Sequence, residues 1–183
     1  MLQISLFLVI SLILLAISWK SLQNPGSHGF HRFFAWEAIL ALILVNTPVW
    51  FENPYTWHQI LSWCLLVACL IPLIFGTYSL RREGKPVDQR AGDPSLLAFE
   101  KTTKLVTNGI YKYIRHPLYS SLLLLAWGAY FKSPAWIGGL LAGTATLFLV
   151  ATARADEAEC VRFFGESYHS YRQQTKMFIP YLL

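Results

Sequence analysis

The sequence predicts an all-α integral membrane protein with about five transmembrane helices, in which a cytoplasmic loop and a C-terminal helical tail form the functional site. Of the 183 residues, 55% are hydrophobic and only 14% are charged. The mean hydropathy is +0.42. Several apolar runs approach the roughly 20 residues that a membrane helix needs. We expect residues 1–183 to form a single domain, with three spans in residues 1–80 and a loop, a helix hairpin and a tail in residues 81–183.

Three apolar runs make up the N-terminal part. Residues 2–18 carry no charge and lack the basic start and cleavage site of a signal peptide, so they are interpreted as a retained first span. Residues 33–50 form the second predicted span and residues 58–80 the third. Pro72 lies inside the third run and predicts a kink there, because proline lacks a backbone N–H.

The second half begins with a long polar segment, residues 81–116, and continues with two apolar runs. Residues 118–130 make a helix of about 20 Å, which is shorter than a bilayer core of about 30 Å. Either this helix begins within the polar segment, or its N-terminal end lies in a depression of the membrane. Residues 135–153 form the last span, in which Gly139 and Gly143 predict close contact with another helix, the fourth by preference. The helix is expected to continue to about Gly165.

The basic residues predict the orientation. Of the 15 Lys and Arg residues, Lys132 alone falls on the far side of a five-span arrangement. The positive-inside rule therefore places the N-terminus outside, and residues 81–116 and the C-terminus in the cytoplasm. The net charge of +5 follows this topology and does not indicate a nucleic-acid partner.

Residues 109–119, GIYKYIRHPLY, mark the border between the polar segment and the fourth span. Arg115 and His116 directly precede Pro117, and proline is favoured at the first position of a helix. A helix start beside two basic side chains is typical of a site for a carboxylate or phosphate. The alternative interpretation is that Arg115 and His116 only anchor the helix at the lipid head groups.

A second polar cluster follows the last span. Asp156, Glu157 and Glu159 lie there, and Arg154 shares a helix face with Glu157. A solvated helix end with an ordinary ion pair is the alternative. The sequence contains no Rossmann fingerprint, P-loop or G-x-S-x-G motif. Its three cysteines match no metal-binding spacing, so no metal site is predicted.

Together, LVTNGIYKYIRHPLY and DEAECVRFFGESYHSYRQQTKMFIP resemble the isoprenylcysteine carboxyl methyltransferase family, which is related to the membrane phospholipid methyltransferases. The resemblance covers roughly residues 103–180. The positions that match the family pattern are Leu105, Val106, Gly109, Tyr111, Arg115, His116, Pro117, Tyr119, Asp156, Glu157, Phe164, Gly165, Tyr168, Tyr171, Ile179 and Pro180.

The resemblance implies S-adenosyl-L-methionine as the methyl donor, bound at the cytoplasmic end of the helices. The residues that it assigns to cofactor binding are Thr103, Lys104, Leu105, Val106, Gly109, Tyr111, Arg115, His116, Pro117, Tyr119, Asp156 and Glu157. Glu157, Arg154 and Arg115 are the predicted catalytic residues. The donor's carboxylate suits Arg115 and the helix start, and its ammonium and ribose suit an acidic side chain.

Two departures from the family pattern bear on the site. The acidic pair is Asp156–Glu157 where Glu–Glu is usual, so either acid can be the one that binds the cofactor. Thr152 stands where the prenyl-protein enzymes carry a substrate arginine, which weakens the case for a prenylcysteine carboxylate.

The predicted acceptor is a lipophilic small molecule or lipid that arrives through the bilayer, its polar end stopping near Arg154 and Glu157. Carboxylate O-methylation is favoured. The alternatives are a phospholipid or lipid-amine N-methyltransferase, which would use Glu157 as a base, or a non-catalytic lipid-binding protein of the same fold. No oligomeric state is predicted.

Overall fold

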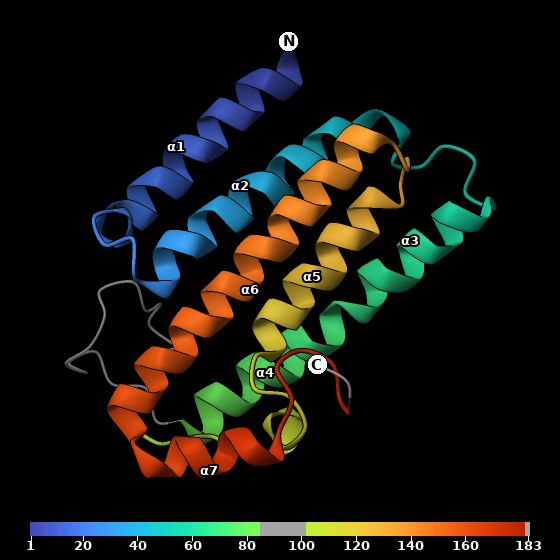
Figure 1. Cartoon of the computed structure of the whole chain (residues 1–183). Helices are drawn as coiled ribbons and strands as arrows, with labels where there is room; N and C mark the ends of the chain where they lie inside the picture. The colour runs from blue at the N-terminus through green and yellow to red at the C-terminus, as the bar shows by residue number, and fades with distance from the viewer. Residues whose placement is uncertain (85–101, 182–183) are drawn as a thin grey trace.

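The molecule is a bundle of long helices with a short helix lying across one end (Figure 1). The structure is a computed structural model that describes residues 1–84 and 102–181. In these residues the α-helices are α1 (Leu2–Leu22), α2 (His28–Asn46), α3 (Trp57–Ala68), α4 (Leu70–Glu83), α5 (Pro117–Tyr130), α6 (Trp136–Phe164) and α7 (Glu166–Gln174). Two 3₁₀ turns, η1 (Thr47–Val49) and η3 (Gly109–Lys112), join them. The predicted all-α class is thus confirmed.

Four stretches of the described residues are long and apolar enough to cross a membrane. They are Leu2–Leu22, His28–Val49, Trp57–Glu83 and Trp136–Phe164. They support a multi-pass integral membrane protein. The fourth predicted span corresponds to α5, which has 14 residues and would reach about 21 Å. A count of five spans therefore stays a prediction. So does the cytoplasmic loop, because residues 85–101 lie outside the described part of the chain.

The second helix starts earlier than the sequence predicts. It begins at His28, where residue 33 was expected, because Ser27 caps its N-terminus. The Ser27 hydroxyl accepts a hydrogen bond from the backbone N–H of Phe30 at 3.2 Å and donates to two carbonyls of the preceding turn. The connector is therefore a tight turn, and hydrogen bonds to both the turn and the helix hold Ser27 in place.

The predicted kink in the third span is confirmed as a break between α3 and α4 at Cys69. Pro72 is the third residue of α4, and it cannot donate to the carbonyl of Ala68, four residues earlier. The two helices both pack against α5. At Gly76, an added Cβ would lie 3.1 Å from the ring of Pro117, so α4 passes very close to the start of α5.

Helices α2 and α6 form the most extensive helix pair. Their interface is built largely from small, fully buried residues, including Ala35 on α2 and Ala145 and Ala153 on α6. The prediction that Gly139 and Gly143 form the packing face is wrong for Gly143, which has no atom within 4 Å of an added Cβ. Gly139 touches only Tyr130, because the buried face of α6 is offset from the line joining the two glycines.

Polar pairs tie the helices together at different depths. Midway along α1 and α2, Ser11 donates to a carboxylate oxygen of Glu37 at 2.6 Å. At the end of the bundle that holds η1 and the α5–α6 turn, Lys132 is 1% exposed. Its ammonium group lies 3.5 Å from the ring centroid of Trp63 and donates to Gln59 at 3.0 Å. This lysine is therefore held inside the bundle end.

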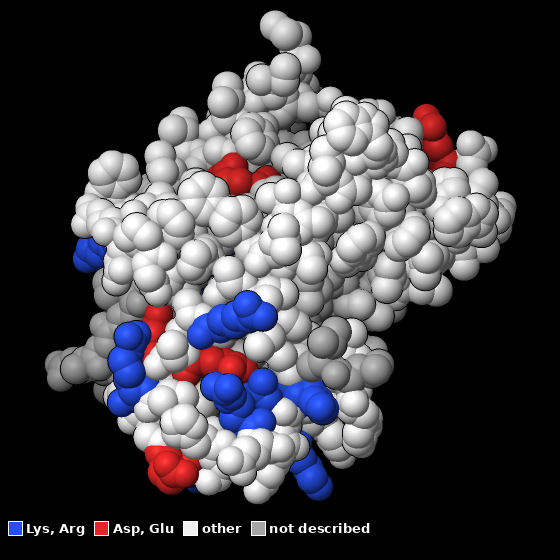
Figure 2. All heavy atoms as spheres, in the orientation of Figure 1, with Lys and Arg blue, Asp and Glu red and all other residues white. Residues whose placement is uncertain are grey.

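Charged side chains gather at the opposite end. Figure 2 shows the visible Lys and Arg atoms concentrated in the lower part, over α7 and the adjoining end of α6, while most of the surface above is uncharged. The α1–α2 turn, the end of α4 and η3 lie toward this same end (Figure 1). The chain thus brings the two polar blocks of its sequence together at one end of the bundle.

Candidate functional site

The segment before α5 is held by the C-terminal tail. Three backbone hydrogen bonds join the two segments. They run from Lys176 N–H to Tyr113 O at 3.1 Å, from Arg115 N–H to Lys176 O at 2.8 Å, and from His116 N–H to Met177 O at 3.1 Å. Pro117 occupies the first turn of α5, as predicted from its fixed φ. The tail thus sets where Arg115 and His116 point.

The Arg115 side chain is largely shielded from solvent and is held by Glu157 and the C-terminal tail. Its Nε donates to Glu157 Oε1 at 2.7 Å, and both side chains are less than a tenth exposed. The same guanidinium donates through a terminal nitrogen to the carbonyls of Arg172, at 3.2 Å, and of Thr175. Arg172 also approaches the other oxygen of Glu157 at 3.7 Å. Glu157 is therefore the counterion of the Arg115 guanidinium, and two backbone carbonyls of the C-terminal tail accept its other hydrogen bonds.

His116 lies between the two predicted acids. Its Nε2 is 3.3 Å from Glu157 Oε1, and its Nδ1 is 3.5 Å from Asp156 Oδ2. Its ring stacks on Tyr119 with centroids 5.4 Å apart. Burial lowers the pKa of His116, but the two carboxylates more than offset this, so the pKa is raised above its ordinary value. His116 is the residue that links Asp156 to the Arg115–Glu157 pair.

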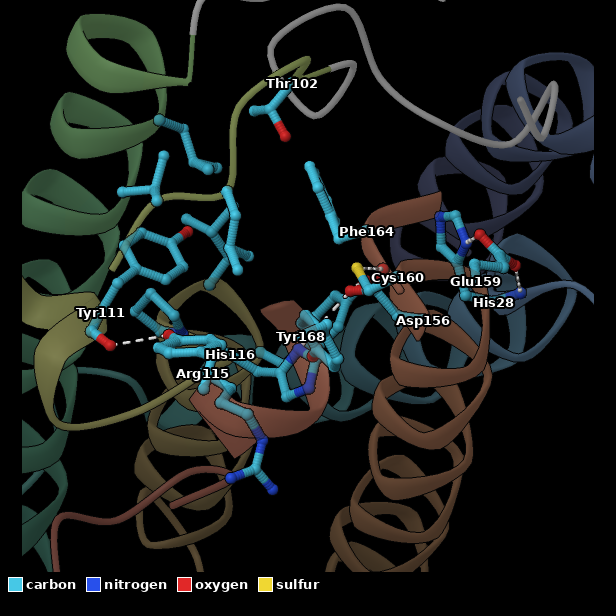
Figure 3. Close-up of a pocket in the computed structure, with 17 residues that line it drawn as sticks. His28, Thr102, Tyr111, Arg115, His116, Asp156, Glu159, Cys160, Phe164 and Tyr168 are labelled. Atoms are coloured by element: carbon cyan, nitrogen blue, oxygen red, sulfur yellow. Dashed lines mark hydrogen bonds and ion pairs between the residues drawn. The ribbon is translucent and has the colours of Figure 1, made fainter. Parts of the chain in front are cut away.

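A cavity of about 100 Å³ opens beside this network (Figure 3). Its aromatic lining comes from Tyr111, Tyr119, Phe164, Tyr168 and Tyr171, and its aliphatic lining from Leu80, Leu105, Val106 and Leu118. Burial raises the pKa of the Tyr168 and Tyr171 phenols, which therefore stay neutral. Tyr171 uses its hydroxyl to donate to the carbonyl of Tyr111 at 2.7 Å. The cavity thus combines aromatic and aliphatic walls with the charged side chains of Arg115 and Asp156.

The far wall of the cavity is polar. His28, at the start of α2, is fully buried, and its Nδ1 lies 2.7 Å from Glu159 Oε2. The backbone N–H of the same residue donates to the second oxygen of Glu159 at 3.2 Å. Figure 3 shows this pair across the cavity from Arg115, with Asp156 between them. The N-terminal helices therefore contribute directly to the site.

The structure brings together most of the residues that the sequence assigns to the cofactor. Those lining the cavity are Leu105, Val106, Tyr111, Arg115, His116, Pro117, Tyr119 and Asp156. Glu157 lies behind this lining, against Arg115. Thr103, Lys104 and Gly109 are exposed and do not line the cavity, where Thr102 does. Of the predicted catalytic residues, Arg154 is also exposed and outside the cavity, because it lies on a different face of α6 from Asp156.

Several lining residues were not assigned a role from the sequence. Glu159 and Cys160 follow Asp156 by one helical turn, so their helical spacing could have indicated them. Phe164, Tyr168 and Tyr171 were part of the matched pattern, but without a role. His28 and Leu80 come from parts of the chain with no motif, and only the packing of α2 and α4 places them here.

Comparison with known proteins identifies the same region. A family model for phospholipid methyltransferases matches residues 93–167. A methanethiol S-methyltransferase of Crocosphaera subtropica is 32% identical over 43% of this chain and 30% of its own length. Another from Pseudomonas sp. (strain GM41(2012)) is 34% identical over 78% of this chain and 55% of its own length.

A third relative is the protein-S-isoprenylcysteine O-methyltransferase of Schizosaccharomyces pombe, 36% identical over 42% of this chain and 33% of its own length. The chain spans between a quarter and a third of the length of the first curated relatives that it matches. No solved structure matches it. The family match and the named relatives agree in kind: residues 93–167 of this chain are similar to membrane methyltransferases of the phospholipid and isoprenylcysteine type.

Proposed function

We propose that this protein is an S-adenosyl-L-methionine-dependent methyltransferase of the membrane. The observation that carries the proposal is the buried network of Arg115, Glu157, His116 and Asp156 at the start of α5, beside an aromatic-lined cavity. Titratable groups that act on one another beside a cleft are candidates for a functional site, and three of these four groups, Arg115, His116 and Asp156, line the cavity.

The residues present fit this donor. Asp156 would accept from its ammonium or ribose hydroxyls, while the start of α5 and Arg115 suit its carboxylate. Tyr111, Phe164 and Tyr168 offer flat walls for adenine. Glu157 is committed to Arg115 and His116, so we assign the cofactor contact to Asp156 and the support of Arg115 to Glu157.

When bound, the donor supplies a methyl group on a sulfonium, and the protein's own part is alignment. The walls of the cavity hold two reactants in line and exclude water, which is the main source of rate in a displacement of this kind. The tail fixes Arg115 and His116 through backbone hydrogen bonds, so these groups need no reorganisation.

The acceptor is proposed to be lipophilic and to enter from the inner leaflet, alongside α5 and α6. The aliphatic side of the cavity, including Leu80 and Leu118, supports this route. Each methylene of the acceptor that becomes buried should then add up to about 0.8 kcal/mol. A series of acceptors that differ only in chain length, presented in bilayers, tests the route, and a flat series of kcat/KM would contradict it.

Two chemistries are proposed for the acceptor. A carboxylate, as in the isoprenylcysteine enzymes, needs no base and was favoured from the sequence. A thiol is the second candidate, because Arg154 is exposed and Thr152 is buried, which leaves no arginine from this turn of α6 for a carboxylate. The name of the bacterial relatives, methanethiol S-methyltransferase, agrees with a thiol.

The proposed orientation puts the site in the cytoplasm, where the donor is soluble. The basic end of the bundle carries the site, and the N-terminus of α1 lies at the other end (Figure 1).

Binding of S-adenosylhomocysteine to the purified protein, measured by calorimetry, tests the function. We expect Asp156→Asn to weaken binding about tenfold or more, because it removes a charged hydrogen-bond acceptor. Glu166→Gln, in an exposed position on α7, is the matched control and should bind like the wild type. A wild-type protein that is folded and does not bind would reject a methyltransferase and favour a non-catalytic membrane protein.

A further inference from the structure

His28 and Glu159 line the cavity but take no part in the donor contacts proposed above. His28 lies outside the matched residues 93–167 and is the first residue of α2. Its side chain is fully buried, yet it lines the same cavity as Arg115 and Asp156. Burying a histidine costs free energy unless its ring is well hydrogen-bonded, so its partners indicate what it can do.

Glu159 holds His28 at two points. One carboxylate oxygen is 2.7 Å from the ring Nδ1, and the other accepts from the backbone N–H at 3.2 Å. A carboxylate at Nδ1 fixes the proton on that nitrogen and makes Nε2 the basic one. An imidazole oriented in this way by a carboxylate is the arrangement that activates hydroxyl and thiol nucleophiles.

The surroundings of the pair are charged on both sides. A ring nitrogen of His28 and one oxygen each of Asp156 and Glu159 all lie within 4.8 Å of one another. Arg32, four residues along α2, is the positive group that acts on the ring, and Asp156 and Glu159 on α6 are the negative ones. An imidazolium formed here would be stabilised by both acids.

We infer that His28, oriented by Glu159, is the proton acceptor for a thiol that this protein methylates. The inference rests on the proposed function and chooses between its two acceptors. A carboxylate reaches the site already ionised, so it would leave His28 without a task. A thiol near neutral pH is largely protonated and must lose its proton to attack.

The step balances as follows. The thiol proton moves to His28 Nε2, and the sulfur lone pair forms the new bond to the methyl carbon of the sulfonium donor. The electron pair of the breaking carbon–sulfur bond stays on the donor sulfur, which becomes a neutral thioether. The imidazolium, paired with Glu159, then returns its proton to water.

The test compares two thiols of different acidity, each with one aromatic ring, as acceptors for the whole protein in micelles. Phenylmethanethiol is a weak acid, whereas 4-nitrothiophenol is ionised near neutral pH. We expect His28→Asn to lower kcat/KM for phenylmethanethiol by about a hundredfold or more, the usual effect of losing a general base. The loss for 4-nitrothiophenol should be far smaller, because that thiol needs no base.

A second readout does not depend on turnover. Phenylmethanethiol added to the protein with S-adenosylhomocysteine should show the ultraviolet absorption of a thiolate in the wild type, and a weaker band in His28→Asn and Glu159→Gln. His31→Asn is the matched control, because His31 lies on the same helix, packs on Phe148 and does not line the cavity. It should behave like the wild type in both assays.

Other outcomes overturn the inference. An equal loss with both thiols would mean that His28 only positions α6, and an unchanged rate would exclude it from the reaction. Wild-type activity that a chelator abolishes would assign the three groups to a divalent cation instead. A wild type that methylates a carboxylate but neither thiol would retain the proposed function and reject this inference. Failure to bind S-adenosylhomocysteine would reject the proposed function itself.

Discussion

Arg115 and Glu157 form a buried ion pair, with Nε and Oε1 2.7 Å apart. The pair joins the residues just before α5 to α6, at the end of the bundle that we propose faces the cytoplasm. Arg115 belongs to the cavity lining and Glu157 lies behind it, and His116 and the tail complete the hydrogen bonds of the pair. The pair therefore stabilises the arrangement of the site. We expect its loss to lower the free energy of unfolding more clearly than it changes the chemical step.

This pair predicts a strong coupling. Arg115→Ala or Glu157→Ala alone should lower the free energy of unfolding by about 3–5 kcal/mol, because each leaves an uncompensated buried charge. The double variant should lose clearly less than the sum of the two. Unfolding in mixed micelles measures all three. Arg154→Ala, an exposed neighbour, is the control and should change stability little. Additive losses would show that the two side chains do not stabilise each other.

The raised pKa of His116 predicts a dependence of stability on pH. The folded protein holds the proton more tightly than the unfolded chain, whose histidine pKa is 6.5. The resulting stabilisation is fully present below pH 6.5 and is lost as the pH rises through the higher folded-state pKa. The Tm measured against pH should therefore fall above 6.5 in the wild type and fall less in His116→Gln.

His31→Gln serves as the control for that series, because it removes a histidine from the same end of the bundle without touching Asp156 or Glu157. Its Tm should follow the wild-type curve. Parallel curves for wild type and His116→Gln would assign the pH dependence to another group.

Two glycines predict opposite effects of the same substitution. An added Cβ at Gly128 would lie 2.9 Å from the side chain of Leu66 and 3.2 Å from its backbone nitrogen. Gly128→Ala should therefore force α3 and α5 apart and cost about 1–3 kcal/mol. Gly143→Ala meets nothing within 4 Å and should be neutral or stabilise the helix by up to about 1 kcal/mol. Thermal unfolding of the two variants, compared with the wild type, checks this; equal destabilisation would place Gly143 in a helix contact.

The proposed orientation predicts the reactivity of introduced cysteines. Lys132 is too buried for labelling, so Ala135→Cys, at an exposed position beside it, is the better probe of that end. In a variant without the three native cysteines, an impermeant reagent should label position 135 in intact cells. Lys112→Cys, exposed at the basic end, should react only after permeabilisation. The reverse pattern would put the site outside.

The features that could be predicted from the sequence are those that depend only on residues close together in the chain. The apolar runs, the break near Pro72 and the start of α5 at Pro117 all follow from composition and backbone chemistry within a few residues. The grouping of Arg115, His116 and Asp156 came from the resemblance of two blocks. The structure brings these groups together as expected.

What the sequence could not predict depends on packing between distant segments. His28 reaches the cavity only because α2 packs along α6 over its whole length, and no motif marks it. Arg154 and Asp156 are two residues apart, yet the rotation of α6 turns one outward and the other inward. The packing face of α6 was misplaced at Gly143 for the same reason, since a glycine at the correct spacing need not contact the neighbouring helix.

The way the tail is joined to the segment before α5 has a consequence for how the protein is made. Arg115 and Glu157 are synthesised before the carbonyls of Arg172 and Thr175 that complete the coordination of the guanidinium. The helices can therefore enter the membrane while this end of the bundle is still open, and the tail, which is made after them, closes it. A nascent chain that stalls before the tail, or a product trimmed within it, would be an inserted bundle without an assembled site.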